Sequence, residues 1–271
     1  MAVGILVLGG LGTVAMDSDV KKLGSVSMGY GLTCNDSLDY THTVFVEVAT
    51  SQNCPPCHYW SQNIQNVYTS GNYEFEYVDM IVYDYYGDVL NWDAYAWKDL
   101  YGITGYPTSI LDGDYRRIVG NQPGLLTGTL DDCGSRTVAD ITANMTISWL
   151  GNATIEVNIT IQNNEETQYD GYIRACITEI ISRYNTSGGV PFHFGFLDYA
   201  FVNDISINPG AVYTDSVIWD GSDHADAHGD DFGDIAPDNI KVIMGVFNDD
   251  NGYVDETTAA TLGDGEEPVL Q

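Results

Sequence analysis

The sequence is poor in positive charge and has no long apolar run. Its 271 residues hold only 9 Lys and Arg against 39 Asp and Glu, which gives a formal net charge of −30. A protein that binds nucleic acid needs a basic surface to neutralise phosphates, so this composition excludes nucleic acid as a partner. An anionic membrane surface is disfavoured for the same reason. With 44% apolar residues, the chain can nevertheless bury enough surface for two ordinary domains.

Charge is absent altogether from residues 1–16, and no basic residue precedes this apolar stretch. It is shorter than the ~20 residues of a membrane-spanning helix. The segment is interpreted as the remnant of an export signal or anchor. Val3, Ile5 and Val7 alternate as in a strand, so the alternative is a strand buried in its own fold or in a neighbouring subunit. Residues 17–38 are interpreted as an extracytoplasmic lead-in.

Five N-x-S/T tripeptides favour an exported protein, because this tripeptide accepts N-linked glycans in secreted proteins. Aspartate outnumbers glutamate by 29 to 10, and lysine occurs only four times, a composition that suits the outside of a cell. We therefore expect an extracellular or cell-surface protein. The glycosylation candidates are Asn35, Asn144, Asn152, Asn158 and Asn185.

The first half of the chain alternates strand and helix patterns. Residues 43–49 (TVFVEVA) predict a buried strand. Cys54 opens a predicted helix, in which Trp60, Ile64 and Val67 recur at helical spacing. The elements predicted after it are a strand at 73–83, a helix at 91–100, strands at 109–111 and 115–119, and a helix at 123–130.

The second half predicts strands only. From about residue 140, apolar and polar residues alternate with period 2, and turn residues separate the runs at short intervals. This pattern is typical of an antiparallel β-sandwich. The predicted strands lie at residues 141–150, 152–164, 172–181, 211–219 and 239–248.

Three features of the first half resemble the thioredoxin superfamily. They are the strand at residues 43–49, the CPPC motif that runs from Cys54 to Cys57 and opens a helix, and the pair Tyr106 and Pro107 before a hairpin. Together they cover about residues 39–132. Asn53 stands where this family usually has an aromatic residue.

The whole chain is also similar to secreted proteins, some of them related to outer-membrane lipoproteins, that join a thioredoxin-like domain to an immunoglobulin-like domain. This resemblance implies an α/β thioredoxin-like domain at residues 39–138. It implies an all-β immunoglobulin-like sandwich at residues 139–271.

The CPPC motif is suited to thiol–disulfide chemistry. A thiolate is the attacking species, and the N-terminus of a helix favours negative charge, so we assign Cys54 as the nucleophile. Cys57 lies one turn further on and attacks the mixed disulfide to release the partner. Pro55 and Pro56 fit the first helical turn, where a backbone N–H has no partner in the helix.

The resemblance implies roles for three more residues. Pro107 is expected to follow a cis peptide bond and to face the motif. Its neighbour Tyr106 is expected to present backbone groups to a substrate peptide. Glu47, on the strand beneath the motif, is either a buried carboxylate that relays a proton to Cys57 or an exposed strand residue.

The cysteines leave alternatives open. Cys54 and Cys57 form either a redox-active pair, a static disulfide that staples the start of the helix, or a zinc site, although no second C-x-x-C completes four ligands. Cys34 and Cys133 flank the first domain, and a structural disulfide between them would stabilise an exported protein. Cys176 is interpreted as a buried free thiol.

A glycine-rich acidic loop is the only other candidate site. Oxygen-rich loops bind Ca²⁺, and histidines favour a transition metal, but the spacing fits no EF-hand. A solvated acidic loop is the alternative to a metal site. The candidate ligands are Asp220, Asp223, His224, Asp226 and His228.

Two classes of function compete. The first is an extracytoplasmic thiol–disulfide oxidoreductase that acts on protein thiols and disulfides and needs no cofactor. The second is a structural cell-surface or filament subunit, which would assemble as a homo-oligomer through the apolar N-terminal segment. A Ca²⁺-dependent adhesion module is a third interpretation.

Overall fold

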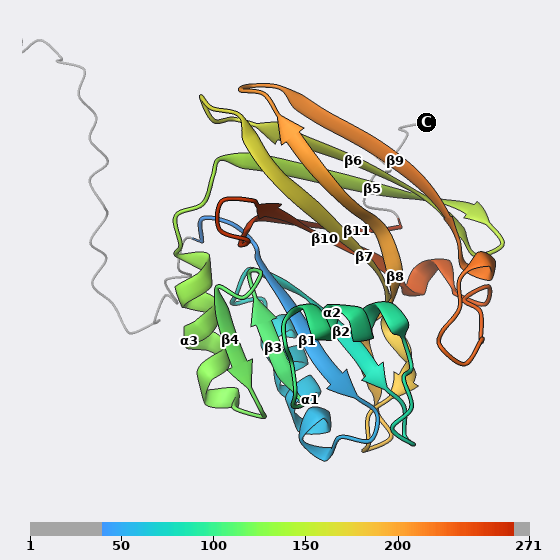
Figure 1. Ribbon diagram of the computed structural model, residues 1–271. Coiled ribbons are helices and arrows are strands. Elements are labelled where there is room, and N and C mark those ends of the chain that lie inside the picture. Colours follow the sequence, from blue (N-terminus) through green and yellow to red (C-terminus); the bar gives the residue numbers. More distant parts are fainter. Residues whose placement is uncertain (1–39, 263–271) are drawn as a thin grey trace, which may run out of the picture. The chain divides into compact units, whose positions relative to one another are not determined.

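The computed structural model describes residues 40–262 (Figure 1). Within this range lie the helices α1 (Pro55–Thr69), α2 (Trp92–Leu100) and α3 (Pro123–Gly134). Short 3₁₀ turns, η1 and η2, cover Gly221–Asp223 and Pro237–Asn239. None of the helices in the described range is long and apolar enough to cross a membrane. The strands are β1 (Val44–Ser51), β2 (Phe75–Tyr83), β3 (Thr108–Leu111), β4 (Arg116–Val119), β5 (Ile141–Gly151), β6 (Thr154–Asn163), β7 (Tyr169–Asn185), β8 (Pro191–Ile207), β9 (Val212–Asp220), β10 (Ile240–Asn248) and β11 (Val254–Thr261).

Most of these strands belong to one large sheet. Eight strands pair in the order β11-β10-β7-β8-β2-β1-β3-β4, and a second sheet has the order β5-β6-β9. The large sheet is mixed, because β1 is parallel to β2 and antiparallel to β3. All eight residues of β1 are buried, which explains why its sequence is almost continuously apolar.

The two halves of the chain meet in the centre of the large sheet. Strand β2, from the first half, pairs with β8, from the second, at Asp79 and Gly195. Strands β7 and β8 are each 17 residues long and pair with each other along most of their length. Long strands of this kind reach both the region near the helices and the region near the smaller sheet.

The expected fold class is therefore wrong, and so is the resemblance that implied it. The chain is predominantly β, and no thioredoxin-like α/β domain followed by a separate immunoglobulin-like sandwich is evident in the described residues. The helices and strands predicted over residues 43–134 are present, but their strands share one sheet with β7, β8, β10 and β11. The boundary expected at residues 138 and 139 falls between α3 and β5.

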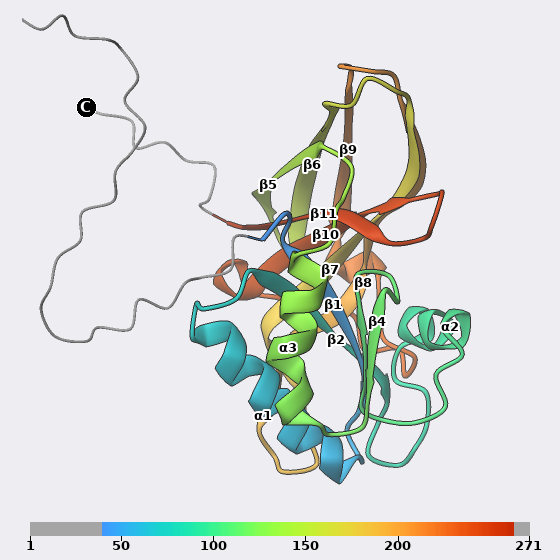
Figure 2. The ribbon, with the colours of Figure 1, turned by 90° about the vertical axis from the view of Figure 1, so that its left-hand side faces the viewer.

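Helices cover both faces of the part of the large sheet that contains β1, the strand leading into the CPPC motif. Figure 2 shows α1 and α3 on one face and α2 on the other. One apolar core packs around β1, β2 and these helices, with Phe45, Trp60 and Tyr77 among its largest buried side chains. A second core fills the space between the β5-β6-β9 sheet and the facing side of β7 and β10. The outward residues of β5 alternate with its buried ones, as the period-2 pattern predicts.

Candidate thiol–disulfide site

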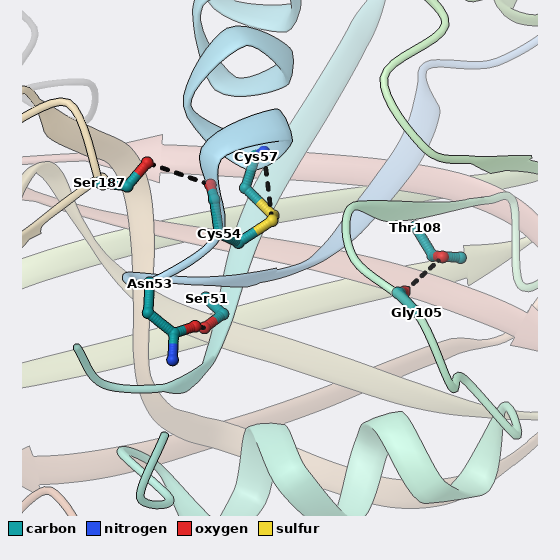
Figure 3. The surroundings of a disulfide bond; sticks show 7 residues. All are labelled: Ser51, Asn53, Cys54, Cys57, Gly105, Thr108 and Ser187. Atoms are coloured by element: carbon teal, nitrogen blue, oxygen red, sulfur yellow. Dashed lines mark hydrogen bonds between the residues drawn. A yellow bond between two sulfur atoms is a disulfide. The ribbon is translucent and has the colours of Figure 1, made fainter. Parts of the chain in front are cut away.

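Cys54 and Cys57 are joined by a disulfide at the start of α1 (Figure 3). Their Cα atoms are 5.3 Å apart. Both residues are buried, but Cys54 keeps 9% of its surface exposed and Cys57 only 1%. Cys54 is therefore the more accessible of the two cysteines.

The local sequence fixes Cys54 as the N-cap of α1. Pro55 and Pro56 occupy the first two helical positions and have no N–H to donate. The backbone N–H of Cys57 is therefore the first amide donor of the helix, and it points at Cys54 Sγ from 3.2 Å. This donor lies at the N-terminus of the helix, where the helix dipole favours negative charge.

The turn before β3 lies beside the disulfide. The Tyr106–Pro107 peptide bond is cis, which confirms that prediction. Thr108 pairs with Ala49 near the end of β1, which brings this turn close to the segment that leads into the motif. The Thr108 hydroxyl donates to the carbonyl of Gly105 at 2.9 Å (Figure 3).

A segment far away in the sequence completes the surroundings. Residues 185–190, which we call the hairpin tip, connect β7 to β8. The Ser187 hydroxyl donates to the carbonyl oxygen of Cys54 at 3.2 Å (Figure 3). His58 Nδ1 lies 2.9 Å from the Thr186 hydroxyl. No local motif marks this contact, because a turn between two strands does not reveal in the sequence which helix it will meet.

The proton-relay role suggested for Glu47 is not supported. Glu47 is fully buried, but it pairs with Arg174 Nη2 of β7 at 2.5 Å. Successive residues of a strand point to opposite faces, and Val48 is in register with Asp79, which contacts α1. Glu47 therefore points to the face away from α1. Burial raises its pKa, and the Arg174 guanidinium opposes that change.

Asp79 is the buried carboxylate beneath α1, and the sequence analysis did not single it out. It accepts a hydrogen bond from the Ser61 hydroxyl at 3.4 Å, while its Oδ1 atom has no hydrogen-bond partner. Burial raises the pKa of the Asp79 carboxyl from its ordinary 3.8 to about 8, against the hydrogen bonds from Ser61 and from the His193 backbone. Ser61 follows Cys57 by four residues, so both side chains lie on the same buried face of α1.

Two other cysteines lie within the described residues, and neither joins this site. Cys133 is a buried free thiol in α3. Cys34 lies outside the described residues, so the Cys34–Cys133 disulfide stays a prediction. Cys176 is a buried free thiol in β7, as predicted. Burial raises the pKa of both thiols, which makes them poor nucleophiles.

The acidic loop does not assemble a metal site. Across residues 40–262, no three His, Cys, Asp or Glu side chains are grouped so that they could hold an ion. The loop carboxylates bind protein groups instead: Asp220 accepts from Ser222, and Asp226 accepts from Tyr184 and from the backbone of His228. The two histidines turn outward from the cluster, His224 to Asp198 and His228 to Asp84. Asp223 belongs to η1.

Four of the five glycosylation candidates lie at the surface. Asn144 and Asn152 are exposed, and Asn158 and Asn185 are partly exposed. Asn144 and Asn158 share the outward face of the smaller sheet, where Asn144 pairs with Thr160 and Asn158 with Thr146. Asn35 and the N-terminal assembly segment, residues 1–16, lie outside the described residues.

Comparisons with known proteins do not extend this picture. No family model matches the chain, and no curated protein is similar to it in sequence. A structural-genomics protein from Agrobacterium tumefaciens shares 13% identity over 85% of this chain and 98% of its own, with a TM-score of 0.45. The β-glucosidase DesR from Streptomyces venezuelae matches 45% of this chain and 15% of its own at 12% identity, with a TM-score of 0.28. A β-glucosidase from Erythrobacter marinus shows the same coverage and identity, with a TM-score of 0.31. Likenesses this weak support no inference about function.

Proposed function

We propose that this protein is an extracytoplasmic thiol–disulfide oxidoreductase that exchanges electrons with protein thiols and disulfides. The observation that carries the proposal is the Cys54–Cys57 disulfide at the start of α1, in which Cys54 keeps a slight exposure of 9% and Cys57 only 1%. A bond that served only as a staple would need neither this asymmetry nor an amide donor directed at Cys54 Sγ.

The exchange balances within the two partners. In the reduced protein, the Cys54 thiolate attacks one sulfur of a partner disulfide, and the other partner sulfur leaves as a thiolate and takes a proton. Cys57 then loses its proton and attacks Cys54 Sγ. The Cys54–Cys57 bond forms, the mixed disulfide breaks, and the second partner thiol is released. Two electrons pass from the cysteine pair to the partner, and the reverse sequence oxidises a dithiol.

Asp79 is our candidate for the group that accepts the Cys57 proton. A carboxyl with a pKa of about 8 is close to the ordinary ~8.5 of a cysteine thiol, so a proton passes between them at little cost. It lies beneath the helix face that Cys57 shares with Ser61. Glu47, held by Arg174 on the other face, does not meet this requirement.

The direct test is a disulfide-exchange assay with insulin as the protein disulfide and dithiothreitol as the reductant. We expect the native protein to accelerate insulin reduction and the Cys54→Ser variant to be inactive. The Cys57→Ser variant should retain the first attack and accumulate a mixed disulfide, visible by mass spectrometry. Cys133→Ala is the matched control, because it removes a thiol outside the site. If the native Cys54–Cys57 bond resists dithiothreitol, or if Cys54→Ser remains active, the proposal is wrong.

A further inference from the structure

Three segments next to the motif each carry an exposed aromatic or aliphatic side chain. Tyr59, two residues after Cys57, is 57% exposed, and Tyr86, in the turn after β2, is 90% exposed. That turn reaches the motif, since a Cβ added to Gly87 would lie 3.6 Å from Asn53 Nδ2. Val190, on the hairpin tip, is 40% exposed. Exposed tyrosines are among the side chains that contribute most to binding a partner.

Several contacts hold the hairpin tip in place beside the disulfide. Besides the contacts of Ser187 with Cys54 and of Thr186 with His58, Tyr85 donates its hydroxyl to the carbonyl of Thr186 at 2.7 Å. Gly188 packs so closely on the His58 ring that an added Cβ would lie 2.4 Å from Cε1. The tip therefore has little freedom to move away from α1.

A pocket of about 280 Å³ opens between α1 and the hairpin tip. Its wall from α1 includes His58, Ser61 and Gln62, and its other wall includes Val190 and His193. No carboxylate lines it, although the chain carries a net charge of −30. Pockets for drug-sized ligands span ~300–1,000 Å³, so this one suits a single side chain and its peptide groups.

We propose that the hairpin tip and this pocket form a docking surface for the extended segment of a partner protein that flanks its reactive cysteine. This inference rests on the proposed function and deepens it. The amide and hydroxyl groups of the pocket suit main-chain groups and uncharged side chains. The net charge of −30 on the chain repels an acidic segment and attracts a basic one. The preferred partner is therefore a polypeptide whose cysteine is flanked by uncharged and basic residues.

The test compares a disulfide-bonded peptide with a small disulfide that is too small to reach the pocket. The probes are a peptide whose cysteine is flanked by uncharged residues, the same peptide with flanking lysines, and 2-hydroxyethyl disulfide. Val190→Asp places a negative charge at the rim of the pocket. We expect it to lower kcat/KM for the uncharged peptide about tenfold relative to the small disulfide, and to favour the lysine peptide over the uncharged one.

Val212→Asp is the matched control, because Val212 is an exposed valine on β9, in the other sheet. It should leave the ratio of peptide to small-disulfide activity unchanged. An unchanged ratio in Val190→Asp, or no preference of that variant for lysine, would overturn the docking proposal. If the native protein reduces the small disulfide but Val190→Asp shows no selectivity, only the docking surface is wrong. If the native protein reduces none of the three probes, the proposed function itself is wrong.

Discussion

Each face of the β1–β2 strand pair buries a carboxylate, and the two carboxylates have different partners. On the face away from α1, Glu47 has a guanidinium at 2.5 Å and lies beside the α2 helix and β7. On the face beneath α1, Asp79 has no ion-pair partner among the described residues and accepts hydrogen bonds from the Ser61 hydroxyl at 3.4 Å and from the His193 backbone. Both are fully buried. The two carboxylates therefore differ in whether a cationic side chain lies beside them and not in how deeply they are buried.

Countercharge decides what each carboxylate can do. A buried charge that is paired contributes to one fixed arrangement of the chain, because removing its partner leaves an uncompensated charge. A buried carboxyl without a cation keeps most of its proton at neutral pH, and its ionised fraction accepts a proton there. Glu47 is therefore part of the scaffold that joins β1 to β7, whereas Asp79 is suited to proton transfer beneath α1.

The largest effect should come from Arg174→Met. This change leaves Glu47 buried without its cation and should destabilise the fold by about 3–5 kcal/mol. The double variant Glu47→Gln/Arg174→Met should recover most of this loss, because neither charge then remains. Urea unfolding followed by circular dichroism measures both. A single variant that is as stable as the native protein would show that the Glu47–Arg174 pair is not what holds this face.

The next effect concerns Asp79 and pH. Its folded pKa of about 8 lies above the ordinary 3.8, so between these values the folded state binds more protons than the unfolded state. Its contribution to stability is therefore greatest at low pH and is lost as the pH rises through 8. Asp79→Asn removes this titration and should gain on the order of a few kcal/mol over the native protein at pH 9.

The measurement is urea unfolding of both proteins from pH 5 to pH 9. The advantage of Asp79→Asn should widen from pH 5 to about pH 8 and stay constant above it. Other titrating groups contribute equally to the free energy of unfolding of both proteins, so their contributions cancel in the difference. A gap that is constant with pH would mean that Asp79 does not change its charge in this range.

Asp79 and Glu47 also show which parts of the site could not be predicted from the sequence. The strand that became β1 and the helix after Cys54 were predicted from local sequence patterns. The pairing of Asp79 with Gly195 joins segments more than a hundred residues apart, and no local pattern encodes it. Asp79 sits in a strand pattern that also contains Glu74 and Glu76, so its complete burial was not apparent. The sequence around Arg174 likewise did not predict its ion pair with Glu47 on β1.

A third experiment separates the two carboxylates by kinetics. If Asp79 accepts the Cys57 proton, Asp79→Asn should slow the resolution of the mixed disulfide by about 100-fold near pH 7. The difference should shrink as the pH rises past the thiol pKa, because hydroxide then removes the proton. The Glu47→Gln/Arg174→Met variant should resolve the mixed disulfide at the native rate. Quenched-flow alkylation and mass spectrometry follow the reaction. Equal slowing in both variants would indicate a general loss of packing.

The smallest effect should follow from Ser61→Ala, and its sign is informative. The Ser61 hydroxyl donates to Asp79 and so favours the charged carboxylate, which holds the carboxyl pKa below the value that burial alone would set. Removing the hydroxyl should therefore raise the pKa above about 8 by less than one unit, equivalent to at most about 1.4 kcal/mol. The carboxyl ¹³C chemical shift of Asp79, followed from pH 5 to pH 10, measures it directly. A downward shift would mean that the protonated Asp79 donates to Ser61 instead. In that case the hydroxyl would stabilise the neutral acid, and Ser61 would work against proton release beside Cys57.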